Sequence, residues 1–392
     1  MTIEPQLRPA ENEADAEAFA RLIVDAFAVP EKDARAWPQQ LGLENVRLFA
    51  REQEVQACLA YYRMGQWFGG RRVSSVGVAG VAVEPPLRGR GIASRLMRAA
   101  LLELADSNVA ISSLYPASIA LYARAGYSSA GGRYEVRVPC DRLPRTSRSA
   151  GMLRLESCAD PRMRACYERV ATRRNGWLSR SEPLWARVRE QRGILREGWA
   201  WMRDGECAAY VWFSRAPRAL LQTDIVCSDL VAVDRESAEA LLGFLASYST
   251  VCKELVFYSA PGDPLLEVFD EFSWRLSHLH PWMLRIVDAA LAISERGFST
   301  ALRARVSLEL TDDLLARNRG KFTLVVEDGR GRLEPGGQAA VSLDIRGLAS
   351  LFSGQLSAEA LAFNAACRGS NADLETLTSL FAGSPPATAE MY

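Results

Sequence analysis

Histidine is scarce in this chain of 392 residues, which contains only His278 and His280. The first 140 residues hold no histidine, and this absence excludes a histidine acid or base from that part of the protein. An H-x-H pair can bind a metal ion, but no nearby cysteine or carboxylate completes a convincing ligand set around these two residues. We therefore expect a structural or surface pair, and we predict no metal site.

Long apolar runs are also missing. No window approaches the roughly 18 uninterrupted apolar residues of a membrane span, and the N-terminus has no basic segment followed by an apolar core. Basic and acidic residues balance at 47 each, so no overall field attracts nucleic acid or an anionic membrane. We expect a cytoplasmic protein with neither a nucleic-acid nor a membrane partner.

Paired cysteines are absent as well. The eight cysteines are scattered singly, without a C-x-x-C pair, and a chain of this length does not need disulfides for stability. We therefore expect reduced thiols in the core. The composition, 48% hydrophobic and 24% charged, is that of a globular protein long enough for two or three domains.

Three regions follow one another along the chain. The polar, proline-containing segment CDRLPRTSRSAG, residues 140–151, has the composition of a linker and separates the first region, 1–145, from the second, 146–285. Both regions mix helical with strand-like runs. In the first we predict a helix at 14–27 and strands at 47–50, 57–64 and 73–83; in the second, a helix at 162–172 and strands at 207–213 and 255–259.

The third region, 286–392, is entered through PWMLRIVDAALAIS (281–294). It carries the strand-like runs VSLEL, KFTLVVEDG and AAVSLDI and ends in a helical stretch. Alternating strands packed by helices predict an α/β fold for the chain, with a small α+β domain at this end.

The most informative stretch is VAVEPPLRGRGIASRLM, residues 81–97. The strand that leads into it is interrupted by Gly77 and Gly80, and a glycine inside a strand often marks a bulge or a close approach to the backbone. Val81 and Val83 would offer free N–H and C=O groups there. Two prolines then end the strand.

The basic turn Arg88–Gly91 opens a helix. Its glycines allow successive backbone N–H groups to converge, and the helix N-terminus adds a partial positive charge. The turn therefore predicts an anion site suited to pyrophosphate. It is not the phosphate loop G-x-x-x-x-G-K-[ST], because no lysine follows. The apolar positions of the helix have helical spacing: Ala93, Leu96, Met97, Ala100, Leu101 and Leu104.

This stretch resembles the acetyl-CoA motif of GNAT N-acetyltransferases, a V-x-V strand followed by R/Q-x-x-G-x-G/A, which Arg88, Gly91 and Ala93 meet. Downstream, ASIALYARAGYSSAGG matches the L-Y-x-x-x-G-F/Y of the same family. The whole chain resembles the Eis (enhanced intracellular survival) family. That resemblance implies an N-terminal GNAT fold, a second GNAT-like domain without the cofactor motif, and a C-terminal sterol-carrier-protein-like domain.

The resemblance implies that acetyl-CoA is the acyl donor. The strand residues Val81, Ala82 and Val83 would bind the pantetheine arm, while Ala117 and Ser118 would lie near the thioester. The turn would hold the pyrophosphate mainly through backbone N–H groups. Its residues are Arg88, Gly89, Arg90, Gly91, Ile92, Ala93 and Ser94.

The L-Y-x-x-x-G match implies that Tyr122 donates a proton to the leaving CoA thiolate. A phenol with a reference pKa of about 10 can donate to a thiolate whose thiol has a pKa of about 8.5 only when the geometry favours it. Tyr127, which follows Gly126, is the alternative donor, although its position is more typical of a packed strand residue.

Eis-like proteins are thought to use the C-terminal carboxylate as the base, and here it belongs to Tyr392. The tail GSPPATAEMY fits this role, because Pro385 and Pro386 keep it extended and Met391 and Tyr392 provide apolar anchors. A terminal carboxylate has a reference pKa of about 3.5, so burial would have to raise its pKa, or a water molecule would relay the proton. A frayed terminus is the alternative.

The acceptor is the least defined partner. Phe27 and Trp37 are candidates for lining a pocket for a bulky amine, and Asp25 and Glu390 for attracting a cation; core packing and solvated carboxylates are the alternatives. The resemblance implies small polyamine-like acceptors, including aminoglycosides, and a homohexamer. Two other functions stay open: regulatory acetylation of protein lysines or N-termini, and a lipid-binding or small-molecule-binding module.

Overall fold

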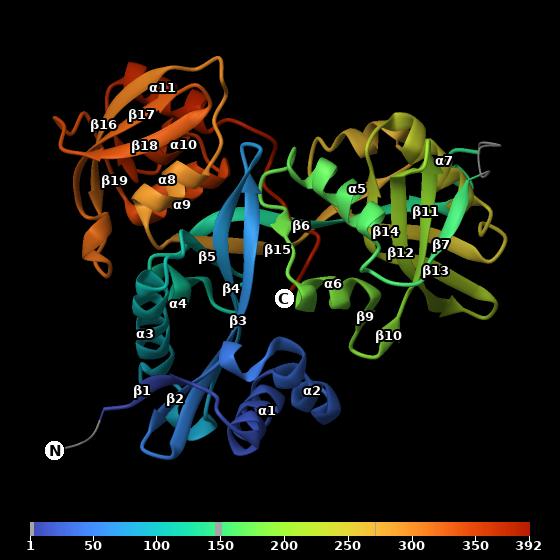
Figure 1. The fold of residues 1–392 in the computed structure, drawn as a ribbon, viewed down its shortest axis with the longest axis horizontal. Helices are drawn as coiled ribbons and strands as arrows, with labels where there is room; N and C mark the ends of the chain where they lie inside the picture. The colour runs from blue at the N-terminus through green and yellow to red at the C-terminus, as the bar shows by residue number, and fades with distance from the viewer. Residues whose placement is uncertain (1–3, 146–150, 271) are drawn as a thin grey trace.

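Three lobes are visible in Figure 1: a first lobe (residues 4–145), a second lobe (151–270) and a third lobe (289–381). The computed structural model describes residues 4–145, 151–270 and 272–392. Within these residues, thirteen strands form one sheet that runs through the first two lobes in the order β1-β2-β3-β4-β5-β15-β6-β14-β13-β12-β11-β7, with β8 paired to β3.

The first lobe wraps helices around the long β3–β4 hairpin. The helix α1 begins where the Asn12 side chain accepts a hydrogen bond from the Asp15 N–H, and it buries Phe19, Leu22 and Ile23 against the sheet. The predicted helix and strands are confirmed. The elements are β1 (Gln6–Pro9), α1 (Glu13–Phe27), α2 (Glu31–Leu41), β2 (Val46–Arg51), β3 (Glu54–Phe68), β4 (Arg71–Val83), α3 (Ile92–Asp106), β5 (Ile111–Leu114), α4 (Ile119–Arg124) and β6 (Ser128–Pro139).

The second lobe repeats this organisation, and its predicted helix and strands are confirmed too. A capping box of Asp234 and Ser237 starts its longest helix, α7. The elements are β7 (Met152–Leu155), α5 (Pro161–Ala171), β8 (Leu178–Ser179), α6 (Glu182–Arg189), β9 (Glu190–Gln191), β10 (Ile194–Leu195), β11 (Glu197–Arg203), β12 (Glu206–Ala219), β13 (Gln222–Ala232), α7 (Arg235–Ala246) and β14 (Cys252–Ser259).

The strand β15 (Arg275–Ile286) joins the two lobes. It leaves the second lobe and inserts between β5 and β6 of the first, pairing antiparallel with both. The run 281–294, expected to enter the third region, therefore divides: Pro281–Ile286 belongs to the shared sheet, and only the rest leads into the third lobe. The hydrogen-bonded sheet continues across the first predicted limit, 145, whereas its last strand along the chain ends at Ile286, next to the second predicted limit, 285.

The third lobe is a mixed sheet of order β18-β17-β16-β19-β20, packed by helices. Buried Arg296 donates from Nε to the Phe352 carbonyl (3.0 Å) and from Nη2 to the Phe381 carbonyl (3.1 Å), which satisfies the C-terminal ends of two helices at once. The elements are α8 (Ala289–Glu295), β16 (Ala304–Thr311), β17 (Gly320–Glu327), β18 (Arg330–Pro335), β19 (Val341–Asp344), α9 (Ile345–Ser353), α10 (Ala358–Phe363), β20 (Cys367–Arg368) and α11 (Asn371–Phe381).

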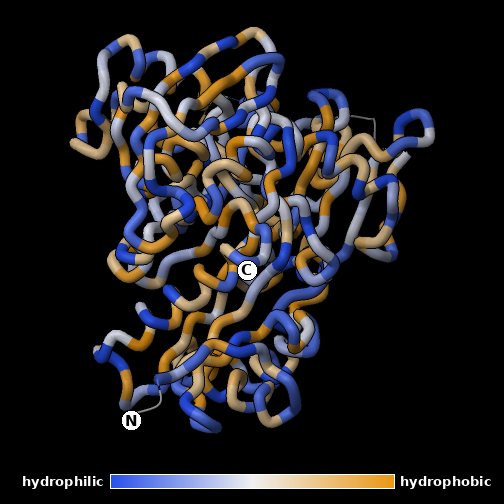
Figure 2. The backbone as a smooth tube through the Cα atoms, turned by 60° about the vertical axis from the view of Figure 1, so that its left-hand side comes forward, coloured by the Kyte–Doolittle hydropathy of each residue, from blue (hydrophilic) through white to orange (hydrophobic). Residues whose placement is uncertain are grey.

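The interior is apolar and its thiols are free. All eight cysteines are buried and unpaired, as predicted. Figure 2 shows hydrophobic segments, in orange, throughout the backbone of the molecule. In the described part of the chain, no helix is both long and apolar enough to cross a membrane.

A buried ion pair joins the first lobe's sheet to the third lobe. Arg285 of β15 donates from Nη2 to both carboxylate oxygens of Asp312, each at 2.7 Å, and both side chains are almost fully buried. Burial alone would raise the pKa of Asp312, but Arg285 and the amide of Asn318 outweigh burial and hold that pKa below its usual range. The pair therefore stabilises the fold when Asp312 is ionised.

We expect Asp312→Ala to lower the free energy of unfolding by about 3–5 kcal/mol at pH 7, because it leaves the Arg285 charge buried and unpaired. The folded-state pKa of Asp312 is lower than the unfolded one, so this stabilisation is present at neutral pH and is lost as the pH falls through the folded value. Urea unfolding at pH 7 and pH 3 measures both effects.

The matched control is Arg303→Ala, which removes a pair with Asp328 whose two side chains are about three-quarters exposed. Its expected cost is below about 0.5 kcal/mol. Equal effects of the two substitutions would contradict the role given to the buried pair.

Candidate active site

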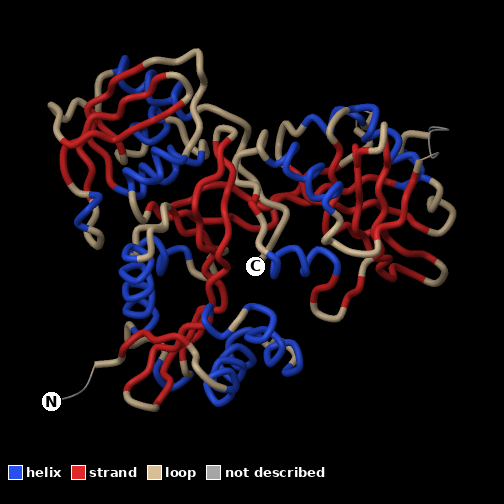
Figure 3. The backbone as a smooth tube through the Cα atoms, in the orientation of Figure 1, coloured by secondary structure: helices blue, strands red, loops and turns tan. Residues whose placement is uncertain are grey.

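The candidate site lies where β4 and β5 part. These parallel strands pair only between residues 75–77 and 111–113, and β4 then continues to Val83 paired with β3 alone. Gly80 has φ +61°, and the pairing of β4 with β3 shifts by one residue between Cys58 and Ala60. Gly80 therefore forms the predicted bulge, which bends β4 away from β5. Figure 3 shows helices on both sides of this strand pair.

The basic turn at the end of β4 presents backbone N–H groups. After a 3₁₀ turn (Pro85–Leu87), Gly89 and Gly91 both adopt φ +76°, and Gly91 is the N-cap of α3. No side chain caps that helix, and a Cβ added to either glycine would meet no atom within 4 Å. Because the space beside the turn is open, its glycines are needed for their conformation, and the uncapped N–H groups can receive an anion.

The turn is fixed to the strand by one of its own arginines. Arg88 donates from Nε to the Val83 carbonyl at 3.1 Å, while Arg90 is exposed. Ala117 and Ser118 lie at the N-terminus of α4, which follows β5, and both are exposed. The residues predicted to contact acetyl-CoA thus come from the end of β4, from the turn with the start of α3, and from the start of α4.

The two candidate tyrosines differ in their hydrogen bonds. Tyr127 is fully buried, and its hydroxyl lies 2.8 Å from Ser112 Oγ, which in turn donates to the Val76 carbonyl at 2.9 Å. Among the described residues, none is hydrogen-bonded to the Tyr122 hydroxyl. Burial raises the pKa of Tyr122 to about 12, so this phenol stays protonated at neutral pH.

Gly126 of the same motif is required sterically. It has φ +88°, and a Cβ there would lie 2.8 Å from Nε of buried Arg285. The glycine therefore lets the chain turn from α4 into β6 directly over the Arg285–Asp312 pair.

The C-terminal segment, Ala387–Tyr392, enters the site from between the first two lobes, as the C-terminus in Figure 1 indicates. Ala387 donates to the Asn175 carbonyl (3.1 Å) and Thr388 to the Gly132 carbonyl (3.3 Å). A Cβ on Gly77 would lie 2.5 Å from the Tyr392 ring, and the Tyr392 hydroxyl lies 2.6 Å from Ser113 Oγ. Gly77 therefore marks a close approach, with the terminal residue at the point where β4 and β5 part.

Three side chains that the sequence did not single out hold successive carbonyls of this segment. Arg133 donates to the Ala389 carbonyl at 2.9 Å, Tyr115 to that of Glu390 at 2.5 Å, and Arg187 to that of Met391 at 2.9 Å. They come from β6, from the loop after β5 and from α6. No local pattern marks them, because each becomes recognisable only when the distant C-terminal segment lies beside it.

An aromatic wall stands next to the parting strands. Trp37 donates to the Tyr62 hydroxyl at 2.8 Å, and its ring lies 3.1 Å from a Cβ built on Gly80. The rings of Tyr62 and Tyr392 are 5.6 Å apart. Phe27, the other predicted pocket residue, is 44% exposed at the C-terminal end of α1.

The carboxylates proposed to attract a cation have different surroundings. Asp25 is exposed on α1. Glu390 is neither solvated nor free, because its Oε1 is ion-paired with Nε of Arg180, whose side chain is only 1% exposed. The alternative of a solvated carboxylate therefore does not hold for Glu390, because an arginine of the second lobe, which it shares with Asp229, engages it.

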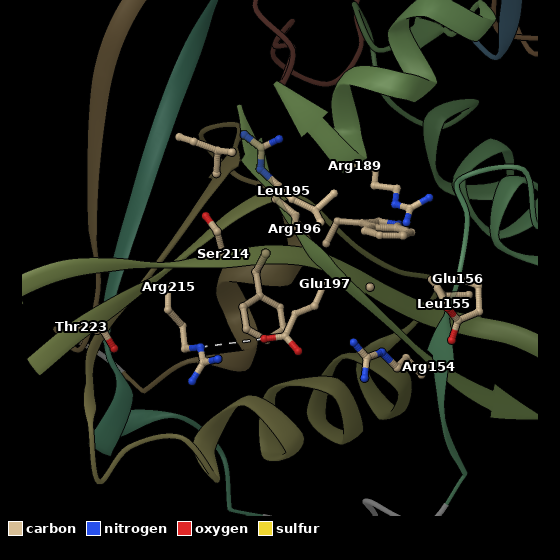
Figure 4. Close-up of a pocket in the computed structure, with 14 residues that line it drawn as sticks. Arg154, Leu155, Glu156, Arg189, Leu195, Arg196, Glu197, Ser214, Arg215 and Thr223 are labelled. Atoms are coloured by element: carbon tan, nitrogen blue, oxygen red, sulfur yellow. Dashed lines mark ion pairs between the residues drawn. The ribbon is translucent and has the colours of Figure 1, made fainter. Parts of the chain in front are cut away.

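A separate cavity of about 710 Å³ lies in the second lobe (Figure 4). Arg154, Arg189 and Arg215 line it, and Arg215 pairs at 4.0 Å with Glu197. None of the predicted site residues contributes to this cavity. In the described ranges, no group of three or more histidine, cysteine or acidic side chains is arranged to hold a metal ion. The His278 ring lies 5.0 Å from that of Tyr134, tilted by 38°.

Comparison with known families agrees with this organisation. Residues 6–130 match an acetyltransferase (GNAT) domain, residues 176–286 a second acetyltransferase (GNAT) domain, and residues 287–389 a sterol carrier protein domain. The chain is 28% identical to the N-acetyltransferase Eis of Mycobacterium tuberculosis over 308 residues, which is 74% of this chain and 73% of the relative. An uncharacterized N-acetyltransferase of Streptomyces griseus is 26% identical over 367 residues, 87% of this chain and 84% of that protein.

Solved structures share the fold over the full length. A GCN5-related N-acetyltransferase from Anabaena variabilis superimposes with a TM-score of 0.94 at 28% identity, covering 99% of this chain and 100% of that one. Eis1 from Mycobacterium abscessus shares the fold with a TM-score of 0.82 at 22% identity and the same coverage.

The chain is therefore a GNAT N-acetyltransferase, a class of enzyme that uses acetyl-CoA. It carries two GNAT domains followed by a sterol carrier protein domain, and the mycobacterial N-acetyltransferases Eis are among its homologues.

We expect Gly91→Val to weaken acetyl-CoA binding by at least about tenfold, because a β-branched residue disfavours the left-handed conformation that aims the N–H groups at the anion. Gly205→Val is the matched control, since Gly205 also has a positive φ (+81°) and no atom within 4 Å of an added Cβ, but lies in the turn between β11 and β12. Calorimetric titration with acetyl-CoA distinguishes them. Similar affinities for the two variants would remove the turn from the donor site.

Proposed function

We propose that this enzyme transfers the acetyl group of acetyl-CoA directly to a primary amine of a small polyamine-like or aminoglycoside-like molecule, within a ternary complex. The observation that carries the proposal is the position of Tyr392, whose ring packs on Gly77 and whose hydroxyl meets Ser113 at the parting of β4 and β5. In this proposal, donor, acceptor and chain terminus meet at one point.

The acyl donor would lie along the unpaired edge of β4. The backbone of Val81–Val83 would hydrogen-bond the pantetheine arm, and the N–H groups of the turn Arg88–Ser94 would hold the pyrophosphate. Ala117 and Ser118 would border the thioester. The open space around Gly89 and Gly91 supports this placement.

The reaction forms a C–N bond and breaks a C–S bond. The amine nitrogen attacks the thioester carbon, the tetrahedral intermediate expels CoA thiolate, and the nitrogen loses one proton. Tyr122 is the proposed donor to the thiolate, because its phenol is protonated and has no hydrogen-bond partner among the described residues, whereas the Tyr127 hydroxyl is engaged by Ser112. With a pKa of about 12, Tyr122 stabilises the thiolate mainly by a hydrogen bond.

The C-terminal carboxylate of Tyr392 is the proposed proton acceptor. Arg187 donates to the adjacent Met391 carbonyl at 2.9 Å and so helps to hold the terminus in place. A carboxylate with an ordinary pKa of about 3.5 is a weak base, so it accepts the proton most readily from the positively charged nitrogen formed after attack, directly or through a water molecule.

The aromatic wall of Trp37, Tyr62 and Tyr392 supports an acceptor with bulky apolar faces. Arg187 already occupies the cation position on Tyr62, since its guanidinium lies 5.5 Å from the ring centroid. Free, buried thiols at all eight cysteines suit a reducing compartment, which supports a cytoplasmic location.

A homohexamer is proposed from the family resemblance, and light scattering that gives only the monomer mass would refute it.

The proposed function predicts rapid thiol release from acetyl-CoA with one class of amine in a panel of aminoglycosides, polyamines and lysine peptides. Adding a few residues beyond Tyr392 should abolish turnover, because it moves the carboxylate out of the site. Release with lysine peptides alone would instead favour regulatory protein acetylation. Absence of turnover with every amine would favour a binding module.

We expect Tyr122→Phe to lower kcat by roughly 100-fold, with little change in the KM for acetyl-CoA, because it removes only the donor to the thiolate. Tyr127→Phe is the control. It keeps the ring and the bond from Ser112 to the Val76 carbonyl, so it should cost about 1 kcal/mol of stability and little activity. The reverse order of effects would assign the acid to Tyr127.

A further inference from the structure

A buried arginine of the second lobe reaches the C-terminal segment. Arg180 lies between β8 and α6 with 1% of its side chain exposed. Its Nη1 donates to Asp229 Oδ2 at 2.6 Å, and its Nε is ion-paired with Glu390. Two aromatic rings, T-shaped to each other, also lie beside the guanidinium: its central carbon is 3.9 Å from the ring centroid of Tyr167 and 4.5 Å from that of Trp185.

The partners of this arginine are themselves fixed. Asp229 of β13 accepts a second hydrogen bond from the Tyr210 hydroxyl at 2.6 Å, and the Tyr167 hydroxyl donates to the Leu178 carbonyl at 2.8 Å. Glu390 also accepts from Thr388 Oγ1 at 3.0 Å within its own segment. Glu390 is thus the residue through which the C-terminal segment contacts Arg180. The second-lobe residues around Arg180 hold one another in place without it.

The ion pair sets the register of the segment. The donors Arg133, Tyr115 and Arg187 contact backbone carbonyls, which every residue possesses, so a segment shifted along its length would offer them equivalent acceptors. The carboxylate of Glu390 cannot be replaced in this way, because its neighbours Ala389 and Met391 are apolar. Two residues of extended chain then span roughly 7 Å, which fixes how far Tyr392 reaches into the first lobe.

We infer that the second lobe, whose GNAT fold lacks the RGRG turn, is the receptor for the chain's own C-terminal segment, with Arg180 as the positioning residue for Tyr392. A buried guanidinium with one permanent carboxylate partner, Asp229, is held in place and offers its remaining donor to Glu390. The consequence for catalysis rests on the proposed function, whereas the binding of the segment does not.

Digestion with carboxypeptidase A tests the binding itself, because this protease releases a C-terminal aromatic residue only from an undocked segment. Loss of Tyr392 from the full-length protein would be followed by mass spectrometry for the native chain, Glu390→Gln, Arg180→Met and Arg203→Met. Glu390→Gln is the central variant, since it keeps the Arg180–Asp229 pair and the fold of the second lobe. Arg203→Met is the control, because Arg203 pairs with Asp234 on the exposed surface of the same lobe.

We expect Glu390→Gln and Arg180→Met to release Tyr392 at least about tenfold faster than the native chain and the control, because docking loses a buried ion pair. In the thiol-release assay, kcat should fall while the KM for acetyl-CoA stays constant. Equal release from Glu390→Gln and the native chain would overturn the receptor role. Faster release of Tyr392 with an unchanged kcat would overturn the positioning role of Arg180. If the native protein protects Tyr392 from the protease but shows no turnover, the proposed function is refuted and the binding of the segment is not.

Discussion

The separation of β4 from β5 is the constraint on which the rest of the site depends. Parallel strands that stop pairing expose backbone groups in the interior, and such groups must find other partners. The bulge at Gly80 creates the separation, and Ser113 and Gly77 at its inner end meet Tyr392 of the same chain. The outer end, from Val81 onward, remains for the acyl donor. The site is therefore shared between the cofactor and the end of the polypeptide.

The other two lobes place that end of the chain. The third lobe carries the polypeptide away from the sheet and returns it through α11, whose last carbonyl is held by Arg296, and the Arg285–Asp312 pair fixes this lobe to the sheet. The second lobe then holds Glu390 through Arg180. Neither lobe supplies a residue predicted to bind acetyl-CoA, but without them the C-terminal segment would be a flexible tail that loses conformational entropy on docking.

The local features of the fold were predictable because short-range chemistry determines them. A few neighbouring residues encode each of these features: the glycine bulge, the turn that opens α3, and the individual helices and strands. The insertion of β15 between β5 and β6 was not predictable, since its pairing joins segments far apart in sequence. For the same reason no signal of their own marks Tyr115, Arg133, Arg180 and Arg187, and the ion pair between Glu390 and Arg180 was not predictable.

The two glycines of β4 illustrate how local and distant constraints combine. Gly80 needs its positive φ, which the sequence alone can suggest, whereas Gly77 has an ordinary strand conformation and is needed only because an aromatic ring from the end of the chain rests on it. A side chain at Gly77 would compete with Tyr392 for the same space and leave the acyl-donor turn untouched. The size of the side chain that position 77 can carry therefore depends on the aromatic ring of Tyr392.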